Sequence, residues 1–312
     1  MPRRRRGSVY FPSRHQLEAT VCDQDAFDAM TAYQLKSGTL SRRQFGALAV
    51  GAGVLSLLPA VAGAAEVIEA EVEIKTPDGT ADAYFVHPAK GTHPGVLIWP
   101  DAFGLRPAFR QMGRRLAQSG YAVLVVNAFY RQKKAPTAPE HPDFNDPATR
   151  SAIMALMGSL TQETAFTDAK AFVAWLDAQA AVDKKKKVGT TGYCMGGALT
   201  LRTAAAVPAR VGAGASFHGG GLVTDKPDSP HLLIRQIKAQ YLVAIAASDD
   251  EKEPDAKNVL RAAFAAAHLP AEIEVYPGTM HGWCPPDSQV YNPEQAEHAW
   301  ARLLVLFKRA LS

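Results

Sequence analysis

The sequence has 312 residues, 47% of them hydrophobic, which is long and apolar enough for one large domain with a sizeable core and excludes large-scale disorder. Its net charge of +4 arises at the N-terminus, because residues 1–62 hold eight Lys and Arg against four Asp and Glu, leaving 26 of each sign in the rest. An electrically neutral body gives no reason to expect a nucleic acid as a partner.

The N-terminal segment resembles an export signal of the twin-arginine type. Arg42 and Arg43 precede an uncharged stretch, residues 46–65, that is rich in Ala, Gly, Val and Leu. Small residues near its end are suited to signal-peptide cleavage at Ala62 or Ala64.

We therefore expect residues 1–64 to be a leader and residues 65–312 to be the mature domain, exported by the twin-arginine machinery and periplasmic or secreted. A membrane anchor is the alternative, but glycines and Pro59 interrupt the stretch, whereas a stable span needs about 20 strongly apolar residues. We expect no stable membrane insertion once the signal is removed. The leader is long, and a start at Met30 would give a more ordinary length.

From residue 67 the chain alternates strands and helices, which predicts a single α/β domain with a mostly parallel, doubly wound sheet and helices on both faces. Continuous apolar runs mark strands buried on both faces, and helical spacing marks the helices. The expected strands are residues 67–75, 81–86, 94–99, 121–126, 187–191, 211–217, 240–246 and 271–276. The expected helices are residues 107–119, 161–179, 198–206, 255–267 and 293–311. A proline-rich stretch, residues 131–146, is expected to be a surface loop over the site.

A short turn, residues 192–197 (Gly-Tyr-Cys-Met-Gly-Gly), lies between an expected strand and an expected helix. Glycines two positions before and after a Ser or Cys in such a turn form the nucleophile elbow pattern. The turn is too tight for a Cβ at the flanking positions, and it forces the nucleophile into a strained backbone conformation. It also places the thiol at a helix N-terminus, which favours the thiolate. We interpret Cys194 as a nucleophile.

The acid and the base of a hydrolase with this elbow follow the nucleophile, on loops after later strands. Asp249 and Asp250 come after the expected strand 240–246, and His281 comes after the expected strand 271–276. His218 follows an earlier strand and precedes the acid in sequence, so we assign it to the pocket wall.

From about residue 67 to its C-terminus the chain resembles the dienelactone hydrolase family, a branch of the α/β-hydrolases that uses Cys, His and Asp. The matching stretches are residues 192–197, 276–281, 101–105 and 129–131, together with Asp250 and Pro254. The spacing of that Asp and Pro favours Asp250 over Asp249 as the triad acid.

The resemblance implies hydrolysis of a small ester or lactone through an acyl-enzyme. His281, oriented by Asp250, would take the proton of Cys194, and the thiolate would attack the carbonyl carbon. The backbone N–H groups of Ala102 and Met195 would hold the developing oxyanion. The mechanism requires no metal or organic cofactor, and the sequence shows no zinc-ligand spacing.

The expected substrate-binding residues are Asp101, Tyr130, Arg131 and Trp283. Asp101 stands where the family has a Glu that pairs with the resting thiol, and Arg131 matches an Arg that binds the substrate carboxylate. A second Arg of the family is replaced by Pro285. Loss of one charge-assisted contact predicts weaker selection for the usual dienelactone.

Two other functions compete with this interpretation. One is a binding protein without catalysis on a hydrolase fold. The other is a thiol redox protein that uses Cys194 and Cys284, because two cysteines in an oxidising compartment favour a disulfide.

Overall fold

The computed structural model describes residues 58–139, 142, 144 and 146–312. The expected leader lies outside the described residues, except for residues 58–64. Within the part of the chain that is described, no helix has both the length and the apolar character needed to cross a membrane.

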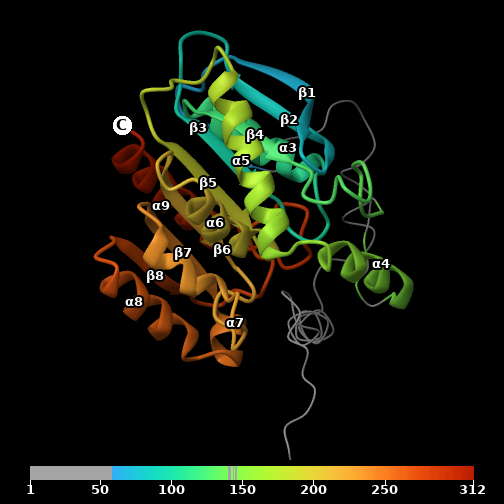
Figure 1. Ribbon diagram of the computed structural model, residues 1–312, viewed down its shortest axis with the longest axis vertical. Helices are drawn as coiled ribbons and strands as arrows, with labels where there is room; N and C mark the ends of the chain where they lie inside the picture. The colour runs from blue at the N-terminus through green and yellow to red at the C-terminus, as the bar shows by residue number, and fades with distance from the viewer. Residues whose placement is uncertain (1–57, 140–141, 143, 145) are drawn as a thin grey trace, which may run out of the picture.

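The described chain is organised around one eight-stranded sheet with the order β1-β2-β4-β3-β5-β6-β7-β8 (Figure 1). The pairs β1–β2 and β2–β4 are antiparallel and all others are parallel. This arrangement confirms the expected mostly parallel, doubly wound sheet. The strands are β1 (Val67–Thr76), β2 (Gly79–Pro88), β3 (Gly95–Trp99), β4 (Ala122–Val126), β5 (Val188–Tyr193), β6 (Val211–Phe217), β7 (Gln240–Ala246) and β8 (Ala271–Tyr276).

Helices cover both faces of the sheet. On the face turned toward the viewer in Figure 1 lie α5 (Gln162–Ala178) and α6 (Met195–Ala206), and α8 (Ala256–Ala266) packs beside α6 through the short helix η1 (Pro230–Gln236). On the opposite face lie α3 (Pro107–Gln118) and α9 (Pro293–Ala310). The five helices expected from the sequence are therefore present.

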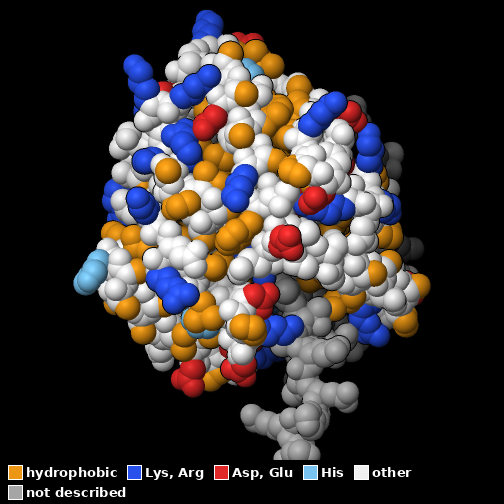
Figure 2. All heavy atoms as spheres, in the orientation of Figure 1, with side chains coloured by type: hydrophobic (Ala, Val, Ile, Leu, Met, Phe, Trp, Pro, Cys, Tyr) orange, Lys and Arg blue, Asp and Glu red, His pale blue; other side chains and the backbone are white. Residues whose placement is uncertain are grey.

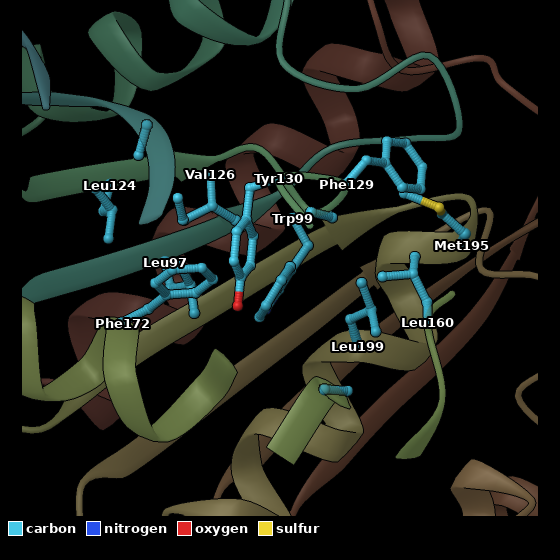
Figure 3. Packing of buried hydrophobic residues seen from close by; sticks show 14 of the residues in the cluster. Leu97, Trp99, Leu124, Val126, Phe129, Tyr130, Leu160, Phe172, Met195 and Leu199 are labelled. Carbon is cyan, nitrogen blue, oxygen red and sulfur yellow. The ribbon is translucent and has the colours of Figure 1, made fainter. Parts of the chain in front are cut away.

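The core is divided by the sheet into layers, as the alternation within β3 shows. Leu97 and Trp99 belong to the cluster under α5, whereas Val96 and Ile98 belong to the cluster under α3 and α9. Figure 3 shows the first of these clusters. Because successive side chains of a strand point to opposite faces, a continuous apolar run is required for a strand covered on both sides, and burial of all five residues of β3 confirms this interpretation.

Three short helices were not expected: η1, α4 (Pro147–Met157) and α7 (Ala247–Lys252). For α4 a local signal exists, because Asp146 caps the helix by accepting from the N–H of Thr149 at 2.8 Å and Pro147 is its first residue. The single turn of α7 has no apolar periodicity and depends on tertiary contacts, among them the bond from the N–H of Ala247 to the hydroxyl of Thr279.

Basic side chains outnumber acidic ones on the face shown in Figure 2, and both are interspersed with apolar side chains. This face has no large field of one sign.

Candidate active site

The elbow has the strained geometry that its sequence predicts. Cys194 precedes the first turn of α6 with φ of 54° and ψ of −122°, in a region that side chains other than Gly rarely adopt. A Cβ on Gly192 would lie 2.0 Å from the carbonyl oxygen of Gly196, and a Cβ on Gly196 would lie 2.4 Å from that of Trp99. The glycines are therefore required by close backbone packing around the nucleophile.

Close packing at Gly196 also brings the elbow against the loop that follows β3. A Cβ on Gly196 would lie 2.4 Å from the carbonyl oxygen of Trp99 and 2.7 Å from that of Pro100. These two residues are followed in the chain by Asp101 and Ala102. Met195 and Ala102, the two expected oxyanion donors, therefore belong to adjoining segments, and their side chains are buried. Their role as donors stays a prediction.

His281 lies between a carboxylate and the thiol. Its Nδ1 is 2.9 Å from Oδ2 of Asp249, and its backbone N–H donates to the hydroxyl of Ser248 at 3.0 Å. Burial disfavours the charged imidazolium, but the negative charges of Asp249 and Cys194, together with hydrogen bonds to both, raise the pKa of His281 well above its ordinary value.

The structure distinguishes the contacts of the two candidate acids, Asp249 and Asp250. Asp250, favoured over its neighbour from the sequence, binds Nζ of Lys257 at 2.5 Å, and it is Asp249 that contacts His281. Both residues lie in the first turn of α7, where successive side chains point about 100° apart, so only one of the two faces the imidazole.

His218 packs directly against both His281 and Cys194. Its ring centroid is 5.2 Å from that of His281, with the two rings at 71°. Its Nδ1 accepts the N–H of Cys194 at 3.2 Å, which fixes the ring proton on Nε2. Burial, and then the nearby charge of His281, lower the pKa of His218 well below its ordinary value, so the ring is neutral.

These features agree with what comparison to known proteins finds. The family model described as "Dienelactone hydrolase family" matches residues 81–311. The chain belongs to the dienelactone hydrolase family. It is therefore a hydrolase of the type that cleaves ester or lactone bonds.

The relatives of this dienelactone hydrolase family member are distant but cover most of the chain. A Methylorubrum extorquens protein with the provisional name carboxymethylenebutenolidase is 28% identical over 91% of this chain and 98% of its own length. The carboxymethylenebutenolidase of Rhodococcus opacus is 27% identical over 76% of this chain and 90% of its own. The crystal structure of a provisionally named dienelactone hydrolase from Klebsiella pneumoniae has a TM-score of 0.68 and 26% identity, over 78% of this chain and 99% of that one.

Arg131 and Tyr130, two expected substrate contacts, form hydrogen bonds with Asp168 inside the fold. The guanidinium of Arg131 donates to both oxygens of Asp168 at 2.7 and 2.8 Å and to Asp78 at 2.6 Å. The Tyr130 hydroxyl donates to Asp168 at 2.7 Å, and its ring lies among the buried side chains shown in Figure 3. Asp168 is fully buried, so its charge requires these partners.

Trp283 is likewise part of the core. Its side chain is fully buried and stacks on Tyr276 at 4.8 Å between ring centroids. Its role as a substrate contact stays a prediction. The neighbouring Cys284 is also buried, and burial raises the pKa of its thiol well above the ordinary value.

Cys194 and Cys284 are not joined to each other by a disulfide, and neither forms one with any other residue that the structure describes. Residues 58–312, apart from the undescribed positions, contain no cluster of three or more His, Cys, Asp and Glu side chains with the geometry of a metal site.

Asp101 takes part in a network that the sequence did not indicate. Its two oxygens accept from Arg106 at 2.6 and 2.9 Å, and the same guanidinium binds both oxygens of Asp287 at 2.6 and 3.0 Å. Asp287 lies on the loop that follows His281. Arg106 therefore links the loop that carries Ala102 to the loop that carries the histidine, a relationship between positions 181 residues apart that sequence reasoning missed.

Proposed function

We propose that this protein is a cysteine-dependent hydrolase that cleaves a small ester or lactone through an acyl-enzyme. The observation that carries the proposal is the contact of His281 with both Asp249 and Cys194. Of these residues, Cys194 lies on the strained elbow at the start of α6. A base that contacts the nucleophile on one side and an acid on the other is the arrangement that nucleophilic catalysis requires.

In the first half of the reaction, the thiolate of Cys194 attacks the carbonyl carbon of the substrate, and the carbonyl oxygen becomes an oxyanion. The N–H groups of Met195 and Ala102 donate to it, and each such donor contributes about 2.7–4 kcal/mol in comparable sites. The imidazolium of His281 then protonates the leaving alkoxide as the carbon–oxygen bond breaks. The product of this half is a thioester on Cys194.

In the second half, His281 is neutral and takes a proton from water, and the resulting hydroxide attacks the thioester. The carbon–sulfur bond breaks, the carboxylic acid leaves, and the thiolate and imidazolium are restored. Asp249 holds the imidazole through Nδ1 and stabilises its positive charge in both halves.

Lactones of the carboxymethylenebutenolide type are one candidate substrate class, since the relative from Rhodococcus opacus carries that name. Arg131 does not support selection of such a lactone by this chain, because Asp168 and Asp78 engage its guanidinium. We therefore include neutral esters of similar size in the same class.

We further propose that residues 1–64 direct export and that residues 65–312 act outside the cytoplasm, on the sequence features of the leader alone. N-terminal sequencing of the exported protein tests this. A mature chain beginning within a few residues of Ala62 or Ala64 is expected, and replacement of Arg42 and Arg43 by Lys should abolish export. A protein that retains its full N-terminus in the cytoplasm would overturn the proposal.

The decisive experiment for the catalytic proposal compares wild type, Cys194→Ala and the matched control Cys284→Ala on p-nitrophenyl acetate and on a dienelactone. We expect activity to be lost only without Cys194, and a mass increase equal to the acyl group to be found on the peptide containing it. Equal activity of wild type and Cys194→Ala would exclude the nucleophile. Absence of hydrolysis across a broad ester panel would favour a binding protein instead.

A further inference from the structure

Helix α7, which carries both candidate acids, begins directly after β7 and is capped from another part of the chain. Its N-cap residue, Ala246, has no side-chain oxygen to accept one of the first N–H groups of the helix. Two of these groups donate instead to Thr279, on the loop that follows β8. The N–H of Ala247 donates to the hydroxyl at 3.1 Å, and that of Ser248 donates to the carbonyl oxygen at 3.2 Å. A residue 32 positions from the start of α7 therefore caps this helix.

The loop and the helix also bind each other in the opposite direction. The Ser248 hydroxyl accepts the backbone N–H of His281 at 3.0 Å. The Thr279 hydroxyl donates to the carbonyl oxygen of Tyr276 at 2.7 Å, so it uses its proton and a lone pair at once and is held in one orientation. Both hydroxyl side chains are buried. We call the three hydrogen bonds between residues 247–248 and residues 279–281 the clasp.

The clasp adjoins both members of the pair formed by Asp249 and His281. Asp249 directly follows Ser248, and His281 is two residues after Thr279. Exposure does not select between the two candidate acids, because the Asp249 side chain is 20% exposed and that of Asp250 is 22% exposed. A rotation of α7 by one residue, about 100°, would exchange them. The clasp fixes this rotation, because it holds the first N–H groups of the helix on one residue of the loop.

We propose that Thr279 is a positioning residue: by capping α7 it fixes the rotation at which Asp249, and not Asp250, contacts His281. The inference rests on the proposed function, in which His281 is the base and Asp249 orients it. Thr279 acts on the orientation of the base and not on the binding of the substrate. Its loss is therefore expected to lower kcat with little change in KM.

The first test compares Thr279→Val with the matched control Thr203→Val on p-nitrophenyl acetate. Thr279→Val removes the acceptor of the Ala247 N–H and should lower kcat about 10–100-fold. The Thr203 hydroxyl is also buried, accepts from Nε1 of Trp99 at 3.0 Å and donates to the carbonyl oxygen of Leu199 at 2.7 Å. Thr203→Val loses two equivalent bonds away from the clasp, so kcat should stay nearly unchanged. Thr279→Ser should restore kcat because serine keeps the hydroxyl.

A double-mutant cycle separates positioning from a merely structural role. If Thr279 acts through Asp249, the double variant Thr279→Val/Asp249→Asn should have the kcat of Asp249→Asn alone, because the contact that the clasp aligns is already lost. Losses that multiply in the double variant, or equal kcat in wild type and Thr279→Val, would overturn the proposal. If Thr279→Val fails to fold, Ser248→Ala takes its place in the cycle, since it removes the acceptor of the His281 N–H.

A measurement independent of catalysis separates failure of this inference from failure of the proposed function. The ring of His281 faces three titratable groups: Asp249 from α7, Cys194 from the elbow and His218 after β6. Burial lowers the pKa of His281, and the charge of Asp249 is foremost among those that raise it. An NMR titration of the ring should therefore give a lower pKa in Thr279→Val than in wild type, and the wild-type pKa in Thr279→Ser.

The two failures then have different signatures. If wild type hydrolyses no ester, the proposed function fails, while a lowered pKa of His281 in Thr279→Val would still support the positioning role. An unchanged pKa of His281 in that variant would overturn the positioning role, whether or not the protein is active.

Discussion

Nδ1 of His218 accepts the backbone N–H of Cys194 at 3.2 Å, so a second histidine holds Cys194 through its main chain. The same N–H also donates to the carbonyl oxygen of Phe217 at 3.1 Å. A protonated His218 has no lone pair at Nδ1 for this contact. The contact therefore requires the neutral ring that burial and His281 enforce.

Because His218 is neutral in the folded protein, we expect it to make the stability of the fold decrease at acidic pH. The unfolded chain takes up a proton on this ring below about pH 6.5, whereas the folded ring does so only at lower pH. Between the pKa of the folded ring and about pH 6.5, unfolding therefore takes up a proton. As the pH drops through this range, the free energy of unfolding decreases by up to about 1.4 kcal/mol per pH unit. Urea unfolding between pH 7.5 and 4.5 should show this loss in wild type and a smaller loss in His218→Gln. An unchanged pH dependence in the variant would contradict the assignment, and His87→Gln serves as the control.

The identity of the acid can be decided with two adjacent substitutions. Asp249→Asn should lower kcat by about 10⁴, because it removes the charge that stabilises the imidazolium and permits the wrong tautomer. Asp250→Asn should leave kcat nearly unchanged, since the bond of Asp250 to Lys257 is partly exposed and contributes at most about 1 kcal/mol to stability. Kinetics on p-nitrophenyl acetate measure both. A larger loss in Asp250→Asn would restore the assignment made from the sequence.

Replacement of Arg131 should act on stability rather than on substrate selection. Arg131→Met leaves the fully buried Asp168 without its closest cation, and breaking a buried pair in this way costs about 3–5 kcal/mol. Denaturant unfolding measures the loss. The ratio of kcat/KM between carboxylated and neutral esters should stay constant, and a collapse of that ratio in a folded Arg131 variant would return Arg131 to the substrate site.

Arg106 links the loop that carries Ala102 to the loop that carries His281, so we expect it to position Ala102 for catalysis. Arg106→Met should free the loop that carries Ala102 and lower kcat by about 10–100-fold, because small displacements of an oxyanion donor are costly. The rate at which iodoacetamide alkylates Cys194 should change little, since the thiolate and His281 remain in contact. Arg106→Lys should rescue only part of kcat, because Lys does not bind two carboxylates bidentately. An unaltered kcat in Arg106→Met would exclude a role of Arg106 in positioning the loop that carries Ala102.

Features with a local physical cause could be predicted from the sequence. Strands β7 and β8 begin and end at the residues expected from the sequence. The elbow was predictable because only glycine tolerates the backbone contacts at positions 192 and 196. His281 was predictable because the order of strands fixes which loops share an edge of the sheet.

Features that depend on residues far apart in the sequence required the tertiary structure. One helical turn of α7 decides that Asp249, and not Asp250, faces the histidine. The buried carboxylate of Asp168 decides that Arg131 is internal, and Asp287 decides the partner of Arg106. The sequence by itself determined the fold and the glycine-flanked turn around Cys194, because backbone sterics and apolar periodicity act locally. Only the tertiary structure decided how the charges are paired, because each charged group binds whichever opposite charge the fold brings within reach.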